Sequence, residues 1–171
     1  AQHEIHLTDH KPFREAHLRI PPHLMEEVRE HLKKLLHMGV IRPSFSPWSS
    51  EMVFVRKKNG DLRLCTDWRK LNNRTIKDSF PLPCIEEIFD VFHGADLFCS
   101  LDLQLGYNQL DIKEEHKQFT AFSAGSLGFY EHNKMGFGLC NSPGTFQRAM
   151  IACLDGLHMK ICIIFIDDIL V

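Results

Sequence analysis

The sequence lacks the features that mark secreted, membrane-spanning or zinc-binding proteins. Its longest apolar run, residues 161–166, is too short to span a membrane, and no signal peptide is recognisable. The six cysteines include no Cys-x-x-Cys pair, and the closely spaced His3 and His6 are followed by no further ligand set, which argues against zinc. We therefore expect an intracellular, cytoplasmic protein with reduced cysteines in its core.

A strong charge of either sign is also missing, as are internal repeats and low-complexity segments. The net charge is −2, which by itself argues weakly against a nucleic-acid-binding protein. Between positions 51 and 77, however, basic residues outnumber acidic ones, and a locally positive surface can serve phosphates on a near-neutral chain. These basic residues are Arg56, Lys57, Lys58, Arg63, Arg69, Lys70, Arg74 and Lys77.

The first half of the chain carries clear helix and hairpin signals. Residues 1–20 show little periodicity and are predicted to form an extended arm. Pro21 and Pro22 favour a helix start, and Gly39 favours its end. The apolar residues between them recur at helical spacing: Leu24, Val28, Leu32, Leu35 and Leu36. Two strands are predicted next, at residues 52–56 and 62–66, joined by an Asn59-Gly60 hairpin turn whose residues both tolerate positive φ.

The second half predicts further short elements of both kinds. Ser142 is expected to cap a helix that runs to about residue 154, with Pro143 at its first position. The other expected elements are a short helix at residues 84–92, buried strands at 97–103 and 160–166, and a second pair of strands at 119–123 and 129–134. This mixture predicts an α+β fold with an antiparallel sheet.

Aspartates stand at the ends of two of the predicted buried strands. Asp102 ends the first, and the adjacent Asp167 and Asp168 end the second. A single aspartate in such a place is usually a turn former, but an adjacent pair beside a core carries a desolvation cost and mutual repulsion. A divalent cation removes both problems, and Mg²⁺ is usually held by one or two carboxylates plus substrate phosphates. Two such ions about 3.5–4 Å apart can activate a hydroxyl and stabilise a leaving phosphate oxygen.

Seven segments of the chain resemble the reverse transcriptases of gypsy-type long-terminal-repeat retrotransposon Pol polyproteins, in the order found in that family. The resemblance covers nearly the whole chain. The segments are LLHMGVIRPS at 35–44, SPWSS at 46–50, VRKKNG at 55–60, LRLCTDWRKLN at 62–72, SLDL with GYNQ at 100–109, FGLCNSPGTFQ at 137–147 and FIDDILV at 165–171.

The resemblance implies a right-hand polymerase fold of the α+β class, comprising the fingers and part of the palm and truncated before the thumb. The N-terminal arm would be residues 1–20, the fingers 21–77 and 110–141, and the incomplete palm 78–109 and 142–171. We expect the strand at 160–166 to lack its antiparallel neighbour, because only Ile169, Leu170 and Val171 remain to supply it. An unpaired strand of that kind would make the isolated chain prone to aggregate and would hold the Asp167–Asp168 turn loosely. Together with the missing thumb, this would leave the isolated chain inactive.

The resemblance also implies roles for individual residues. Asp102, Asp167 and Asp168 would hold two Mg²⁺ ions, with Mn²⁺ as an alternative and the main-chain carbonyl of Leu103 as an extra ligand. Tyr107 would be a steric gate against a 2′-hydroxyl. The remaining nucleotide-binding residues would be Lys57 (or its neighbour Lys58) and Arg63 at the triphosphate, and Phe137 and Gly138 in the pocket.

The residues implied near template and primer are Arg69, Asn72, Phe80, Pro81, Phe165 and Ile166. Two positions depart from the pattern of the family. Gly136 stands where proline is usual, and Phe165 replaces the usual tyrosine, which removes a hydroxyl near the primer end but keeps the ring.

The function implied is that of an RNA-directed DNA polymerase segment of a retrotransposon polyprotein that would also carry ribonuclease H. Its partners would be an RNA or DNA template with primer and deoxynucleoside triphosphates, with no membrane; the oligomeric state is not predicted. A second hypothesis is an inactive relic that at most binds nucleic acid. A third, a partner-binding adaptor, is supported by no motif beyond the first helix.

Overall fold

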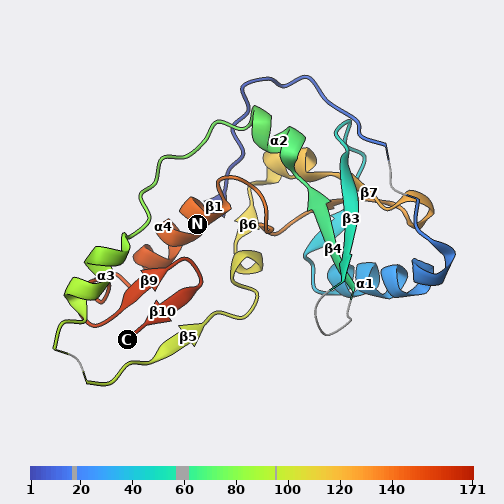
Figure 1. Cartoon of the computed structure of the whole chain (residues 1–171). Coiled ribbons are helices and arrows are strands. Elements are labelled where there is room, and N and C mark those ends of the chain that lie inside the picture. The colour runs from blue at the N-terminus through green and yellow to red at the C-terminus, as the bar shows by residue number, and fades with distance from the viewer. Residues whose placement is uncertain (17–18, 57–61, 95) are drawn as a thin grey trace.

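A five-stranded sheet covered by a long helix forms one end of the molecule (Figure 1). The computed structural model describes residues 1–16, 19–56, 62–94 and 96–171. The strand order is β2-β8-β7-β3-β4, and every neighbouring pair is antiparallel except β3 and β7. Its strands are β2 (Ile41–Pro43), β3 (Ser50–Arg56), β4 (Leu62–Asp67), β7 (Phe122–Ser123) and β8 (Phe129–His132).

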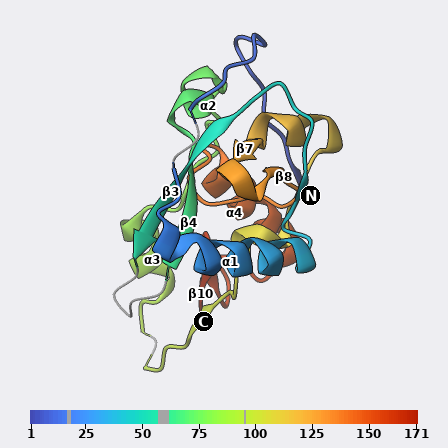
Figure 2. The ribbon, with the colours of Figure 1, turned by 90° about the vertical axis from the view of Figure 1, so that its right-hand side faces the viewer.

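The helix predicted between Pro22 and Gly39 is confirmed. It comprises a 3₁₀ turn, η1 (Pro22–Leu24), and α1 (Met25–His37), and Gly39 follows with a φ of 68°. Figure 2, turned by 90°, shows α1 lying across this end of the molecule. The predicted strands at 52–56 and 62–66 are confirmed as well, whereas the Asn59-Gly60 turn lies outside the described residues.

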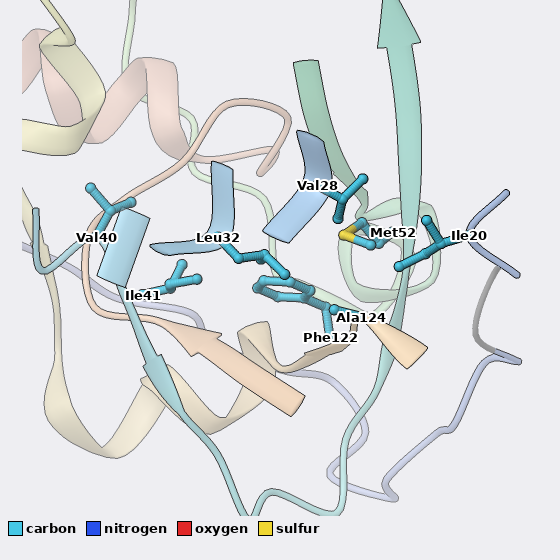
Figure 3. Close-up of a cluster of buried hydrophobic side chains, with 8 residues drawn as sticks. All are labelled: Ile20, Val28, Leu32, Val40, Ile41, Met52, Phe122 and Ala124. Atoms are coloured by element: carbon cyan, nitrogen blue, oxygen red, sulfur yellow. The ribbon is translucent and has the colours of Figure 1, made fainter. Parts of the chain in front are cut away.

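The core of this region lies between α1 and the sheet (Figure 3). Val28 and Leu32 of α1 pack against Met52 of β3 and Phe122 of β7, all of them nearly inaccessible to solvent. Burial of each such side chain stabilises the fold by about 1.5–3 kcal/mol. The helix therefore holds strands that are distant in the sequence in one sheet.

A second sheet of three strands lies at the other end of the molecule, in the order β5-β10-β9 (Figure 1). Its strands are β5 (Ser100–Asp102), β9 (Ile163–Phe165) and β10 (Asp168–Leu170), and both pairings are antiparallel. The expectation that residues 160–166 would lack an antiparallel neighbour is wrong. Three residues of β10 are enough to pair with all of β9, and β10 pairs with β5 on its other side.

Several predictions for this half of the chain were wrong in detail. Residues 97–103 do not form a buried strand: only β5 is extended, and Leu97 is 89% exposed. The strand predicted at 160–166 shortens to β9 because residues 159–161 form turns and Cys162 makes only an isolated bridge with His158. Of the strand predicted at 119–123, only β7 is regular, since residues 114–120 form the 3₁₀ helix η3 (Glu114–Thr120). The helix predicted at 84–92 is confirmed as α3 (Ile85–Val91).

The helix α4 (Ser142–Cys153) confirms the predicted helix but not its cap. Asn141, not Ser142, precedes the first turn, and its side chain makes no capping bond. The Ser142 hydroxyl is buried and donates a hydrogen bond to the Gly136 carbonyl oxygen, at 3.0 Å. Ser142 therefore fastens the preceding loop to the helix start instead of capping the helix.

The N-terminal segment is extended and packs along the middle of the molecule. β1 (Gln2–His3) pairs in parallel with β6 (Asp111–Ile112), and Ile5, Leu7 and Phe13 are buried in a cluster with Trp48 and Trp68. The short helix α2 (Arg69–Arg74) follows Trp68. Two further 3₁₀ helices are η2 (Gly106–Gln109) and η4 (Gly125–Leu127).

Candidate functional site

The three-stranded sheet brings the aspartates of two distant segments together. In the antiparallel ladder, Asp168 of β10 is the direct partner of Asp102 of β5. Directly opposed residues have their Cα atoms about 4.5–5.5 Å apart and their side chains on one face. The Leu103 N–H donates to the Asp167 carbonyl oxygen at 3.1 Å, which ties the third aspartate to the same strand end.

The turn between β9 and β10 has an unusual backbone. Phe165 pairs with Asp168, so Ile166 and Asp167 are its two central residues. Ile166 has a φ of 58°, whereas the φ of Asp167 is negative. A positive φ at the first central residue alone is the pattern of a type II′ turn, in which that position favours glycine. A β-branched residue there is strained, so other contacts must hold the turn.

Gln147 of α4 supplies two such contacts. Its side-chain Nε2 donates to the Ile164 carbonyl oxygen at 2.8 Å, and its Oε1 accepts from the Ile166 N–H at 2.7 Å. The residue is completely buried. The missing side chain of Gly106 permits Asp167 and Phe146 to lie close to its backbone. A Cβ at Gly106 would lie 3.2 Å from the Asp167 Cβ and 3.2 Å from the Phe146 ring.

Aromatic side chains line the space beside the aspartates. Tyr107 is buried, with its ring centroid 4.7 Å from that of Phe137 and 5.4 Å from that of Phe146. Burial, together with the negative charge of Asp167, raises the pKa of the Tyr107 phenol above its usual value. The Tyr107 phenol is therefore neutral at pH 7, and its ring lies against the exposed Phe137 ring.

The loop that carries Phe137 is fastened to α2 and to the residue before it. Trp68 donates its ring N–H to the Phe137 carbonyl oxygen at 3.1 Å. The Asn72 amide donates to the Gly138 carbonyl oxygen at 2.7 Å and accepts from the Cys140 N–H at 2.9 Å. At Gly138, with a φ of 89°, a Cβ would lie 3.0 Å from the Trp68 ring. The loop thus requires a glycine there.

A cavity of about 400 Å³ opens between α1, β4 and this loop, and its lining includes Trp68, Phe137 and His132. Both ring nitrogens of His132 are buried, and neither has a hydrogen-bond partner within the described residues. Burial lowers the pKa of His132 to about 4. The imidazole is therefore neutral at pH 7 and acts as part of the aromatic packing with Trp68 and Phe122.

Other predicted residues belong to different segments from the aspartates or fall outside the described residues. Lys57 and Lys58 fall outside the described residues, and of Arg63 only the backbone, paired with Val55 of β3, is described. Arg69 is 87% exposed and pairs with Asp67. Phe80 lies under the Arg148 guanidinium at 4.6 Å, next to the exposed Pro81.

No group of three or more His, Cys, Asp and Glu side chains in the described ranges is arranged to hold a metal ion. Asp102 and Asp168, which pair in the sheet, and Asp167, in the adjoining turn, thus lie close together without forming a ready-made three-ligand cage. The same ranges contain no helix with the length and apolarity needed to cross a membrane.

Sequence reasoning gave no role to Gln147 or to Gly106. A glutamine among the apolar residues Phe146, Ala149 and Met150 of a predicted helix is a weak signal of a buried hydrogen bond. For Gly106 no local signal exists, because the residues that crowd it, Phe146 and Asp167, lie 40 and 61 residues away along the chain.

The family described as reverse transcriptase (RNA-dependent DNA polymerase) matches residues 55–171. The Pol polyprotein of the Drosophila melanogaster transposon gypsy is 38% identical over 98% of this chain, and that of transposon 297 is 35% identical over 99%. The enzymatic polyprotein of soybean chlorotic mottle virus is 39% identical over 98%. The chain spans 17%, 16% and 25% of the lengths of these three relatives, respectively.

Among solved structures, the prototype foamy virus protease-reverse transcriptase has a similar fold. The TM-score is 0.84 at 23% identity, with 99% of this chain and 22% of that chain covered. The foamy viral protein in complex with an RNA/DNA hybrid gives a TM-score of 0.84 at 19% identity, with the same coverage. At these identities the likeness concerns the fold, which is that of a polymerase fragment of mixed helices and sheets.

Proposed function

The chain belongs to the reverse transcriptase (RNA-dependent DNA polymerase) family, and from that premise we propose that it carries the nucleotidyl-transfer site of a retrotransposon Pol polyprotein. The reaction is the attack of a primer 3′-hydroxyl on the α-phosphorus of a deoxynucleoside triphosphate. A bond forms between the 3′-oxygen of the primer and the α-phosphorus, and the bond from the α-phosphorus to the oxygen that bridges to the β-phosphorus breaks. Pyrophosphate leaves, and the hydroxyl loses its proton. The observation that carries the proposal is the pairing of Asp102 with Asp168 beside Asp167.

The aspartates suit two Mg²⁺ ions, with Mn²⁺ as an alternative. Carboxylate oxygens are the ligands that these hard cations prefer, and Mg²⁺ sites of this class are completed by substrate phosphates and water. Asp102, Asp167 and Asp168 would hold the ions, with the Leu103 carbonyl as an extra ligand. When bound, the ions would activate the hydroxyl and stabilise the charge on the leaving oxygen.

The aromatic residues beside the aspartates suit a nucleotide pocket. Tyr107 would exclude a 2′-hydroxyl by occupying its space, a form of discrimination by exclusion. Phe137 and Gly138 would line the pocket, and the contacts of Trp68 and Asn72 with their carbonyl oxygens support a fixed loop. The triphosphate would lie against Lys57, or its neighbour Lys58, and Arg63.

Template and primer would follow the exposed surface near the remaining predicted residues. Arg69, Phe80 and Pro81 are candidates for the template, and Phe165 and Ile166 for the primer end. The solved foamy viral complexes contain an RNA/DNA hybrid or double-stranded DNA, which supports nucleic acid as the partner. Asn72 fits this group less well, because its amide is already occupied by the loop at 138–140.

Primer extension tests the proposal. The chain would be assayed alone and joined to the segment that follows the matched region in the gypsy polyprotein, with Mg²⁺ and a primed RNA or DNA template. We expect extension by the longer protein, and its loss in Asp102→Asn and Asp168→Asn. Retention of metal and template binding without extension in the longer protein would favour the inactive-relic hypothesis. Recovery of a protein partner with no nucleic acid would favour the adaptor.

A further inference from the structure

We propose that Gln147 is a positioning residue that fixes the Ile166–Asp167 turn against α4 and so sets the places of Asp167 and Asp168. The inference rests on the proposed function for its catalytic meaning, but its structural basis does not. It concerns a residue that touches neither substrate nor metal and acts on the site through the backbone of the turn.

The two hydrogen bonds of Gln147 match those that a further β-strand beside β9 would make. In this hairpin, Phe165 and Asp168 form the pair next to the turn, so the following pair, Ile164 and Ile169, is the non-hydrogen-bonded kind. The Ile164 carbonyl therefore points away from β10, toward the open edge of β9. There it accepts from Gln147 Nε2, while the Ile166 N–H donates to Gln147 Oε1.

One residue of a parallel neighbouring strand, through its own N–H and C=O, would bind the same two atoms, the carbonyl before Phe165 and the N–H after it. The Gln147 side-chain amide thus replaces one residue of a fourth strand. A side-chain amide offers a donor and an acceptor side by side without a charge at any ordinary pH, whereas a carboxyl group does so only when it is protonated. The arrangement also occupies part of an edge that would otherwise be open for pairing with another chain.

The strain at Ile166 explains why the turn needs these two hydrogen bonds. A β-branched residue at a φ of 58° costs about 1–3 kcal/mol and persists only where its surroundings fix it. Without Gln147, the turn can relax to a backbone with negative φ at Ile166. Such a change would move Asp167, which is the next residue.

α4 connects this turn to two other parts of the molecule through consecutive side chains. Thr145 Oγ1 lies 3.0 Å from His3 Nδ1 of the N-terminal segment, Phe146 packs on Tyr107, and Gln147 holds the turn. Because the three residues belong to one helical turn, α4 fixes the turn relative to Tyr107. Gln147 therefore sets the distance between the predicted gate and the predicted metal ligands.

Two substitutions separate the bonds. Gln147→Leu removes both, and we expect a loss of about a hundredfold in the extension rate at saturating template, since misplacement of reacting groups by about 1 Å costs that much. Gln147→Glu keeps an acceptor for the Ile166 N–H but can donate to the Ile164 carbonyl only when protonated. Its rate relative to the original chain should therefore fall as pH is raised, whereas the relative rate of Gln147→Leu should stay flat.

Amide hydrogen exchange of Ile166 tests the two Gln147 hydrogen bonds to the turn, here called the clamp. The measurement requires no enzymatic activity. We expect this amide to be protected in the original chain and in Gln147→Glu, and to exchange at least tenfold faster in Gln147→Leu. Gln118→Leu is the matched control, because Gln118 is exposed on η3 and its side-chain amide donates to the Glu115 carbonyl of the same short helix. This control should leave both measurements unchanged.

The outcomes separate the two proposals. Unchanged Ile166 exchange in a folded Gln147→Leu protein would overturn the clamp, whatever the activity. Faster exchange with full activity and an unchanged Mg²⁺ requirement would overturn its positioning role. If the original chain extends no primer even in its longer form, the proposed function fails, and faster exchange in Gln147→Leu would still support the clamp itself.

Discussion

Asp167 and Asp168 are consecutive residues, yet they stand in different backbone settings. Consecutive residues of a regular strand point to opposite faces of the sheet. Asp168 obeys this rule as the first residue of β10, but Asp167 belongs to the turn and is released from the alternation. The turn is therefore what permits two adjacent carboxylates to serve one site, and the unfavourable φ of Ile166 is the cost of that arrangement.

Tyr107 provides a test of sugar selection at the residue scale. Replacement by valine removes a ring packed between Phe137 and Phe146 and opens space beside Asp167. In the longer protein, we expect ribonucleotide incorporation relative to deoxyribonucleotide incorporation to rise on the order of tenfold or more. Tyr107→Phe is the control, since it keeps the ring. Unchanged sugar discrimination in a folded Tyr107→Val protein would refute the gate.

His132 predicts a pH dependence of stability. Its pKa of about 4 in the fold lies below the usual 6.5, so the unfolded chain binds the proton more readily. The stability that depends on neutral His132 is complete above pH 6.5 and is lost as pH falls toward 4, by about 2 kcal/mol at pH 5. Buried His3, whose pKa is also lowered to about 4 by burial and His116, adds to the same trend.

Denaturant titrations between pH 7.5 and pH 4.5 measure this effect. His132→Phe keeps the ring contacts with Trp68 and Phe122, and we expect it to make the free energy of unfolding less dependent on pH. His37→Phe, the same replacement at the exposed end of α1, is the control. Equal pH slopes for the original chain and His132→Phe would contradict the prediction.

At the scale of elements, α2 and the loop before α4 behave as one unit. The loop has little regular structure, but Trp68 and Asn72 bind its backbone at three points. The position of Phe137 is therefore set by a helix more than 60 residues earlier in the chain. A substitution in α2 should therefore first change the affinity for the ligand that binds beside Phe137.

Asn72→Ala tests this coupling. The substitution removes two hydrogen bonds, each contributing about 1 kcal/mol, and should loosen the loop at 137–140. We expect the KM for the nucleotide to rise several-fold while template affinity changes little. Asn73→Ala, at the exposed neighbouring residue of α2, is the control. A loss of template affinity with an unchanged nucleotide KM would instead support Asn72 as a template residue.

The elements that could be predicted are those whose signals are local. Pro22 and Gly39 bracket the first helix, and the strands on either side of Asn59-Gly60 pair as expected. Leu97 misled because an apolar run usually indicates burial, whereas here it lies exposed beside β5. Ser142 misled because serine before proline resembles a helix cap, whereas the Gly136 carbonyl takes its hydroxyl.

The candidate site divides in the same way. The aspartates were found because each of their two motifs, at 100–109 and 165–171, is a short continuous run that can be recognised by itself. The pairing of Asp102 with Asp168, the clamp by Gln147 and the close approach of Gly106 to Asp167 depend on the register between strands and helices. No local pattern contains that register, because it is decided by packing across the whole fold.

At the scale of the whole molecule, the N-terminal segment connects regions that are otherwise separate. β1 pairs with β6 beside α4, Leu7 forms a bridge with Thr75 after α2, and Phe13 packs on Trp48 next to β3. The segment predicted as an arm is thus part of the core. We expect the two sheets to unfold together while this segment is in place.

Phe13→Ala measures that contribution. Phe13 is buried against Trp48 and lies beneath the Arg74 guanidinium. Its truncation should lower the free energy of unfolding by about 3–5 kcal/mol, measured by denaturant titration with tryptophan fluorescence. Lys11→Ala, at an exposed position of the same segment, should leave it nearly unchanged. Equal stabilities of the Phe13 and Lys11 variants would show that the segment is only loosely attached.

The order β5-β10-β9 has a consequence for synthesis of the protein on the ribosome. β10 is the central strand, so neither outer strand of that sheet has a partner until residues 168–170 have left the exit tunnel. The five-stranded sheet, in contrast, is complete once residue 132 has emerged. The nascent chain can therefore fold its larger sheet first, before Asp102 can pair with Asp168. The carboxylate cluster therefore forms only after the larger sheet can be complete, when β10 emerges and pairs with β5.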